Sequence, residues 1–240
     1  MKFRFVVLTI AVIFASCTKK ESTDSAPVVV GGPPALLQGK ITYSGKVADP
    51  KPIKMAADPV CNSQNKANPA TTETLLVGEG NGLANVFVYV EGNFKPAEPT
   101  ESVVFDQAGC RYIPHVVGIQ AGQTLQIKNS DSTLHNVNAQ AKTNSSFNVG
   151  MATRGQVVEK TFSRPEVIKF KCDVHGWMAG YVGVAAHSFF AVTDEEGSFT
   201  IPDVPSGEYT LVLWHEKLGE RRAPVNVAAN GPAFQFDYQP

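Results

Sequence analysis

The stretch FKCDVHGWMAG, residues 170–180, places a thiol, an imidazole and a thioether at Cys172, His175 and Met178. The preceding residues 167–170 predict a strand that ends just before Cys172. The thiol would then be held on rigid backbone, while His175 and Met178 lie in the loop that follows. This spacing indicates a metal site that needs a fourth ligand from elsewhere in the chain.

Short alternating runs surround this stretch, and no helical period is sustained over ten residues. Glycine, proline, asparagine and aspartate separate the runs, which is typical of strands joined by turns. The pattern predicts an all-β protein made of one or two sandwiches. The clearest runs are residues 39–43, 85–90, 123–128, 167–170, 198–201 and 209–213.

His135 is the candidate fourth ligand, because it follows a predicted strand and turn at residues 127–133. Two imidazoles, one thiolate and a weak thioether form the ligand set of a blue-copper site. A closed structural zinc site would prefer further thiolates or imidazoles to a thioether. The alternative is that Cys172, His175 and Met178 are ordinary packing residues.

The module at residues 99–187 resembles the cupredoxins, and its Cys-x-x-His-x-x-Met loop is similar to that of amicyanin. The resemblance implies a Greek-key sandwich with one type 1 copper ion, and Asn136 as the residue that braces the ligand loop. Gly176 stands where the amicyanin-type loop has proline, which leaves this loop less restrained. The implied copper ligands are His135, Cys172, His175 and Met178.

The parts of the chain on either side of this module resemble a carboxypeptidase regulatory-like β-sandwich. Residues 38–45 and 83–92 look like its opening strands, and residues 193–211 look like their continuation. We therefore predict a discontinuous sandwich, residues 37–98 and 188–240, interrupted by the cupredoxin module at 99–187. The alternative is a single larger sandwich without an insertion.

The N-terminus predicts export and a lipid anchor. Lys2 and Arg4 precede an apolar run at residues 5–15 that is too short for a span of about twenty residues. The sequence FASC, residues 14–17, resembles the bacterial lipobox, which implies a signal peptide at 1–16, a lipidated Cys17 and a flexible tether at 17–36. An ordinary cleaved signal is the alternative.

These features place the protein in the bacterial cell envelope, facing the periplasm. The residue after Cys17 is threonine rather than the aspartate that retains many lipoproteins in the inner membrane, which favours the outer membrane. Loss of residues 1–16 leaves 19 of the 21 basic residues against 22 acidic ones, a net charge of −3. We expect no nucleic acid as partner.

The remaining cysteines are Cys61 and Cys110, in an oxidising compartment. We predict a disulfide between them, which would tie the polar loop at 57–72 to the start of the copper module. Two free thiols are the alternative.

The predicted function is one-electron transfer between redox protein partners, and we expect no enzyme activity. Multicopper oxidases and copper nitrite reductases place histidine before the blue-copper cysteine, where this chain has Lys171. His115 is assigned a structural role, with metal ligation as the alternative. The alternatives are copper storage or delivery, or a surface interaction protein with a vestigial site. The resemblance also implies that the His175 ring edge reaches the surface, with Trp177 in the docking rim; Trp177 packing inward is the alternative.

Overall fold

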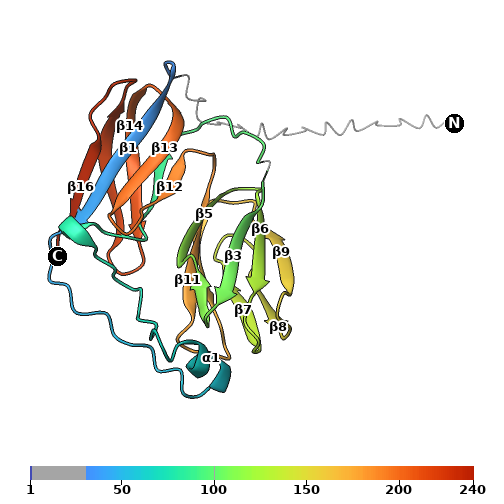
Figure 1. Ribbon diagram of the computed structural model, residues 1–240. Helices are drawn as coiled ribbons and strands as arrows, with labels where there is room; N and C mark the ends of the chain where they lie inside the picture. The colour runs from blue at the N-terminus through green and yellow to red at the C-terminus, as the bar shows by residue number, and fades with distance from the viewer. Residues whose placement is uncertain (2–30, 100) are drawn as a thin grey trace.

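The computed structural model describes Met1, residues 31–99 and residues 101–240, which form sixteen strands, one α-helix and one 3-10 helix. The predicted signal peptide, Cys17 and most of the tether lie outside the described residues. In the described part of the chain, no helix is long and apolar enough to cross a membrane. The strands form four sheets that pack as two sandwiches (Figure 1).

The first sandwich, called the terminal sandwich, takes its strands from the two ends of the described chain. Its sheets have the orders β13-β1-β16 and β12-β2-β14-β15. Every second residue of β1 from Ala35 to Tyr43 is buried, because side chains alternate between the faces of a strand. Its strands are β1 (Pro34–Tyr43), β2 (Phe87–Glu91), β12 (Phe190–Val192), β13 (Ser198–Pro205), β14 (Gly207–His215), β15 (Gly219–Val227) and β16 (Phe234–Tyr238).

The second sandwich, called the central sandwich, is built from the strands between β2 and β12. Its sheets have the orders β4-β3-β6-β9 and β5-β11-β10-β7-β8. Phe105 and Ile127 from one sheet and Phe170 from the other are fully buried in a common core. Its strands are β3 (Val103–Ala108), β4 (Arg111–Ile113), β5 (Val116–Gln120), β6 (Thr124–Asn129), β7 (His135–Gln140), β8 (Phe147–Met151), β9 (Val157–Thr161), β10 (Glu166–Lys171) and β11 (Ala179–Ala185).

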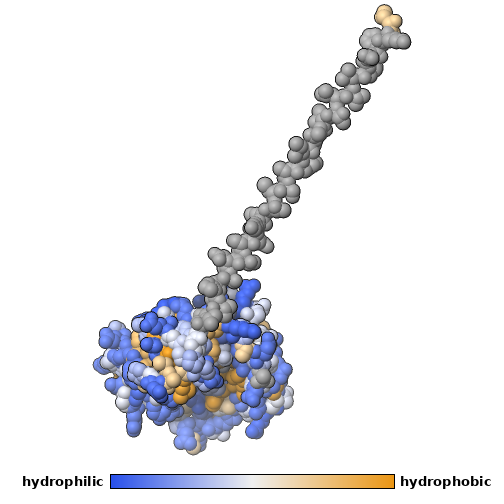
Figure 2. Space-filling model, turned by 90° about the horizontal axis from the view of Figure 1, so that it is seen from above, coloured by the Kyte–Doolittle hydropathy of each residue, from blue (hydrophilic) through white to orange (hydrophobic). Residues whose placement is uncertain are grey.

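The two sandwiches meet through a small apolar cluster around Phe87, Val116 and Ala185. The Phe87 ring lies against β11 so closely that a Cβ on Gly183 would stand 2.6 Å from it. Glycine is therefore required there for the sheets to approach. The face seen in Figure 2 is largely hydrophilic, with apolar residues in smaller patches.

A segment that we call the strap, residues 52–72, lies at the end of the central sandwich, and the chain on either side connects it to the terminal sandwich (Figure 1). It carries helix α1 (Pro59–Gln64), and the 3-10 helix η1 (Glu79–Asn81) follows it. Met55, Cys61 and Ala70 of the strap are buried in the core of the central sandwich. In this respect the structure departs from the division predicted from the sequence, which placed all of 37–98 with the terminal sandwich. The apolar side chains of an otherwise polar loop cause the difference.

Candidate metal centre

The loop between β10 and β11 presents three of the four candidate ligands, Cys172, His175 and Met178. The strands pair antiparallel up to Lys171 and Ala179. Beyond them, the Cys172 amide donates to the Met178 carbonyl at 3.2 Å, and the Met178 amide donates to the His175 carbonyl at 2.9 Å. These two hydrogen bonds close the loop and hold His175 over Cys172.

His135 reaches the same place from the neighbouring strand. It is the first residue of β7, which pairs with β10 in the sheet. The Nδ1 atoms of His135 and His175 are 2.9 Å apart, and the Sγ atom of Cys172 is 3.8 Å from His175 Nδ1. All three ligand atoms lie within 4.8 Å of one another.

This arrangement fits a single bound ion. Metal–nitrogen bonds are about 2.0–2.1 Å and metal–sulfur bonds about 2.3 Å in comparable sites, so N–N and N–S separations cannot exceed about 4.2 and 4.4 Å on one ion. The 2.9 Å between the two Nδ1 atoms and the 3.8 Å between Cys172 Sγ and His175 Nδ1 lie within these limits. His135, Cys172 and His175 are at most 2% exposed, so water is largely excluded from the position they share.

Met178, the predicted fourth ligand, is 2% exposed and belongs to the core of the central sandwich. Asn136 lies where a loop brace is needed, because its Oδ1 accepts hydrogen bonds from the amides of Asp173 and Val174 at 2.5 and 3.3 Å. The backbone amide of Asn136 donates to Cys172 Sγ at 3.4 Å. Asn136 therefore ties β7 to the ligand loop and supports negative charge on the sulfur.

The electrostatics favour a thiolate beside His135. Burial raises the pKa of the Cys172 thiol, but the hydrogen bond from His135 and the amides of Asn136, His175 and Val174 bring it below its ordinary value. Burial lowers the pKa of His135, but hydrogen bonds to Asp131 and Cys172 outweigh this and raise it to about 9. A metal ion would replace the proton shared in this cluster, since metal ligands bind in their deprotonated forms.

Each histidine is backed by a carboxylate that the sequence did not single out. Asp131 Oδ2 lies 3.0 Å from His135 Nε2, and Asp58 Oδ2 lies 3.1 Å from His175 Nε2. A carboxylate accepts hydrogen bonds, so each Nε2 carries a hydrogen and each Nδ1 faces the shared metal position. The two contacts thus set the orientation of both rings.

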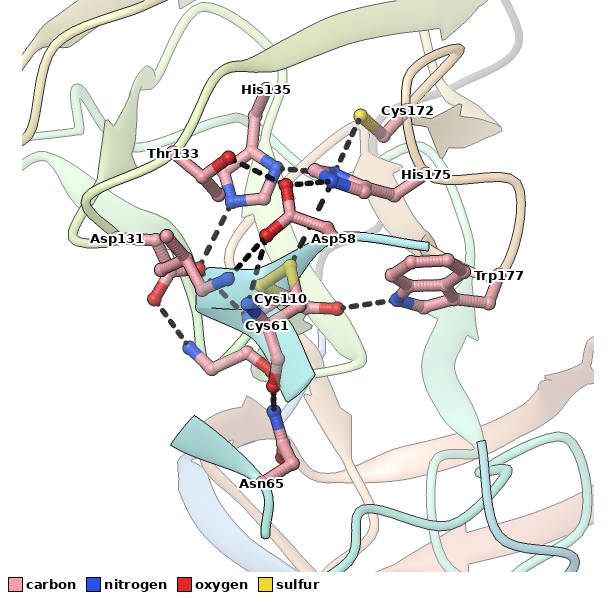
Figure 3. Close-up of a disulfide and its surroundings, with 12 residues drawn as sticks. Asp58, Cys61, Asn65, Cys110, Asp131, Thr133, His135, Cys172, His175 and Trp177 are labelled. Carbon is pink, nitrogen blue, oxygen red and sulfur yellow. Dashed lines mark hydrogen bonds and ion pairs between the residues drawn. A yellow bond between two sulfur atoms is a disulfide. The ribbon is translucent and has the colours of Figure 1, made fainter. Parts of the chain in front are cut away.

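The strap covers His175, as the close-up of this region shows (Figure 3). Asp58 approaches the ring from α1, and Cys61 Sγ lies 3.7 Å from His175 Nε2. The predicted disulfide between Cys61 and Cys110 is present beneath the ring. His175 is only 2% exposed, so the expectation that its ring edge reaches the surface was wrong. The reason is the strap, which occupies the space beside Nε2.

Trp177 also lies against this cluster and is partly buried. Its ring centroid is 5.0 Å from that of His175, and its Nε1 donates to the Cys110 carbonyl at 3.1 Å (Figure 3). This placement fits inward packing better than a freely exposed docking rim. The large apolar side chains exposed next to the ligands are instead Leu134 and Val174, at 46% and 48%.

Among the described residues, His115 belongs to none of the groups that could hold a metal ion. Its Nε2 pairs with Glu216 Oε1 at 2.5 Å, across the junction with the terminal sandwich. The pairing is consistent with the structural role expected for it.

Comparisons with known proteins give two kinds of match. A family model described as polysaccharide lyase family 4, domain II, matches residues 153–234, about a third of the chain. A search of curated proteins returns no significant match.

Several solved structures are similar to part of the chain. A variant of amicyanin in the Cu(I) form is 22% identical, over 41% of this chain and 98% of that one, with a TM-score of 0.33. A purple cupredoxin from Nitrosopumilus maritimus is 26% identical, over 36% and 100%, with a TM-score of 0.30. A copper-containing nitrite reductase from Thermus scotoductus SA-01 is 21% identical over 40% of this chain, with a TM-score of 0.33, and the chain spans only 24% of its length.

The predicted fold class is confirmed. The protein is all-β, and its strands form two β-sandwiches. The functional assignment depends on the candidate metal centre itself.

Proposed function

We propose that the protein is a mononuclear type 1 copper protein that carries single electrons between redox partners. The observation that supports this most is the convergence of two imidazole Nδ1 atoms and one cysteine sulfur in a buried position. One thiolate with two imidazoles is the trigonal set of blue-copper sites, with Met178 as the weak axial candidate. Bound copper would supply one-electron chemistry between Cu(I) and Cu(II).

The protein's own residues suit such a role. His135 begins β7, and Cys172 and His175 lie in a hydrogen-bonded loop after β10, the strand that pairs with β7. The binding position is therefore held by rigid backbone. Burial keeps water and small ligands away from the ion. Copper storage or delivery uses the same ligands, but a covered site slows the exchange that delivery requires.

We further propose that Cys17 carries a lipid that anchors the protein in the bacterial envelope, facing the periplasm and preferably at the outer membrane. Redox proteins of that compartment would be the partners. The chain offers Lys171 rather than histidine before Cys172, so electrons would not pass by that route to a second copper centre.

The test is a visible spectrum of the copper-loaded protein with a reversible reduction potential. Cys172→Ser should abolish the intense absorption, because the band arises from thiolate-to-copper charge transfer. Glu159→Gln is the control, since this exposed carboxylate on β9 accepts from Gln126 on the neighbouring strand. A Cys172→Ser protein that stays coloured would refute the copper assignment. Rapid copper transfer to an apo-acceptor, without reversible redox behaviour, would favour delivery.

A further inference from the structure

A continuous series of contacts joins the two candidate histidine ligands on the side away from the metal position. Asp58 accepts the amide of Cys61 on Oδ1 at 3.0 Å and faces His175 with Oδ2. Cys61 is bonded to Cys110, whose amide donates to Asp131 at 2.8 Å. Asp131 in turn faces His135. These four residues, Asp58, Cys61, Cys110 and Asp131, are drawn in Figure 3.

We infer that Asp58 is a positioning residue of the metal centre, and that the Cys61–Cys110 disulfide keeps it in place. Its carboxylate holds the His175 ring with Nε2–H outward and Nδ1 toward the metal position. The inference rests on the proposed function for its consequences for copper, but the orientation of the ring can be measured without any metal.

Both oxygens of Asp58 have defined partners, which gives the carboxylate a fixed direction. Oδ1 caps α1 by accepting the amides of Val60 and Cys61 at 2.8 and 3.0 Å. Oδ2 accepts the Thr133 hydroxyl at 2.7 Å and faces His175 Nε2 at 3.1 Å. Both oxygens of Asp58 therefore act as acceptors, and Oδ2 is directed at the ring nitrogen of His175.

The disulfide has a clear role in this arrangement. Helix α1 has six residues, too few to be stable by itself. Its attachment to the central sandwich depends on Cys61, which is fully buried, and on Asn65, whose amide donates to the Gly109 carbonyl at 3.1 Å. Without the covalent link, the strap would lose the contact that keeps Asp58 beside His175.

The decisive variant is Asp58→Asn, because asparagine also caps helices well. Its amide oxygen can keep the contacts with Val60 and Cys61, and its NH₂ group then faces His175 Nε2. An NH₂ group is a donor, so it favours the tautomer with the hydrogen on Nδ1. Asp58→Ser is the matched control, because serine caps the helix but is too short to reach the ring.

The first readout is the ¹⁵N NMR signal of the His175 ring in protein without metal, at a pH where the ring is neutral. Wild type should show hydrogen on Nε2, Asp58→Asn should shift it toward Nδ1, and Asp58→Ser should show a mixture. If the His175 ring hydrogen stays on Nε2 in both variants while α1 is still folded, the inference is overturned.

The second readout is the affinity for Zn²⁺, a redox-inert probe of the same ligands. Loss of a partner behind a metal-binding histidine typically weakens binding about 10–100-fold. We expect this loss for Asp58→Asn and for the double variant Cys61→Ala/Cys110→Ala. Glu159→Gln, which removes an exposed carboxylate on β9, should change nothing.

The two readouts separate this inference from the proposed function. If wild type binds Zn²⁺ but shows no blue copper band, the copper proposal fails while the ring-orientation test still stands. If the copper band appears and Asp58→Asn leaves both ring orientation and affinity unchanged, the copper proposal survives and the role of Asp58 does not.

Discussion

The Nδ1 atoms of His135 and His175 lie 2.9 Å apart, although 40 residues separate the two histidines in the chain. Two lone pairs at this distance repel, so a proton or a cation must lie between them. The folded protein therefore holds together groups that a metal ion can bind, and the unfolded chain does not.

From this geometry, we predict that metal raises the stability of the protein. A ligand that binds only the folded state stabilises it by about 2.7 kcal/mol at one hundred times its dissociation constant. Zn²⁺ added at that excess should raise the thermal midpoint of the wild type by several degrees. Cys172→Ala, which removes one of the three ligands, should gain much less; an equal gain would place the metal elsewhere.

The Cys61–Cys110 disulfide should contribute strongly to stability, since it spans a sequence separation of 49. The chain-entropy estimate for such a loop is about 4 kcal/mol. Chemical denaturation of the Cys61→Ala/Cys110→Ala variant should show a loss of that order. Thiol counting on the unfolded mature protein should find only Cys172 free, and three free thiols would contradict the pairing.

His215 should make the terminal sandwich sensitive to acid. Burial is the largest influence on this side chain and lowers its pKa to about 4 from 6.5, and its Nε2 has no hydrogen-bond partner. The unfolded chain binds the proton more tightly than the folded protein does. The contribution of neutral His215 to stability is therefore fully present above pH 6.5 and is lost as the pH falls toward 4. The shift corresponds to about 3 kcal/mol at most.

The variant that tests this is His215→Asn. The amide oxygen of asparagine can accept the backbone amides of Lys217 and Leu218, as His215 Nδ1 does at 3.2 and 3.3 Å. Urea denaturation gives the free energy of unfolding at pH 7.5 and at pH 5. The difference between these two values should be smaller for the variant than for wild type. An identical difference would exclude His215 as the acid-sensitive group.

The sequence predicted the strands with clear alternation, because a buried face leaves a two-residue period. The run at 123–128 overlaps β6 with a shift of one residue, and the run at 209–213 lies within β14. The sequence also predicted His135, Cys172 and His175 as ligands. The short spacing of Cys172 and His175 indicated the loop that the structure forms. Strands such as β9, where only Val158 and Lys160 are half-buried, carry too weak a period to be recognised.

The carboxylates and the strap could not be predicted in the same way. Asp58 is 117 residues from His175, and it lies in a polar segment that reads as a loop. Its only local signal is its place before Pro59, which is typical of a helix N-cap. That signal says where a helix begins but not what the helix covers.

Cys17, outside the described residues, should carry the lipid anchor. Cys17→Ala should release the protein from membranes or leave its signal uncleaved, because the lipid and the cleavage depend on the same thiol. Detergent partitioning and the mass of the N-terminal peptide measure both effects. Unchanged partitioning and processing in the variant would rule out lipidation at this residue.

Trp177 should behave as a packing residue of the metal centre. Its ring lies beside His175 and its Nε1 donates to the Cys110 carbonyl. Trp177→Ala should therefore cost about 2–3 kcal/mol of stability, less than a fully buried tryptophan because this ring is only partly buried. It should also change the absorption of the copper-loaded protein, since the His175 ring would lose its packing contact with Trp177.

Trp177→Phe separates packing from hydrogen bonding. Phenylalanine keeps most of the ring against His175 but cannot donate to Cys110, so this variant should lose only about 1 kcal/mol and keep nearly the wild-type spectrum. Leu134→Ser and Val174→Ser alter the exposed apolar side chains instead, and they should leave stability and spectrum almost unchanged. If Trp177→Ala keeps its stability and colour and only slows electron exchange with a partner, Trp177 belongs to a docking surface and the packing interpretation is wrong.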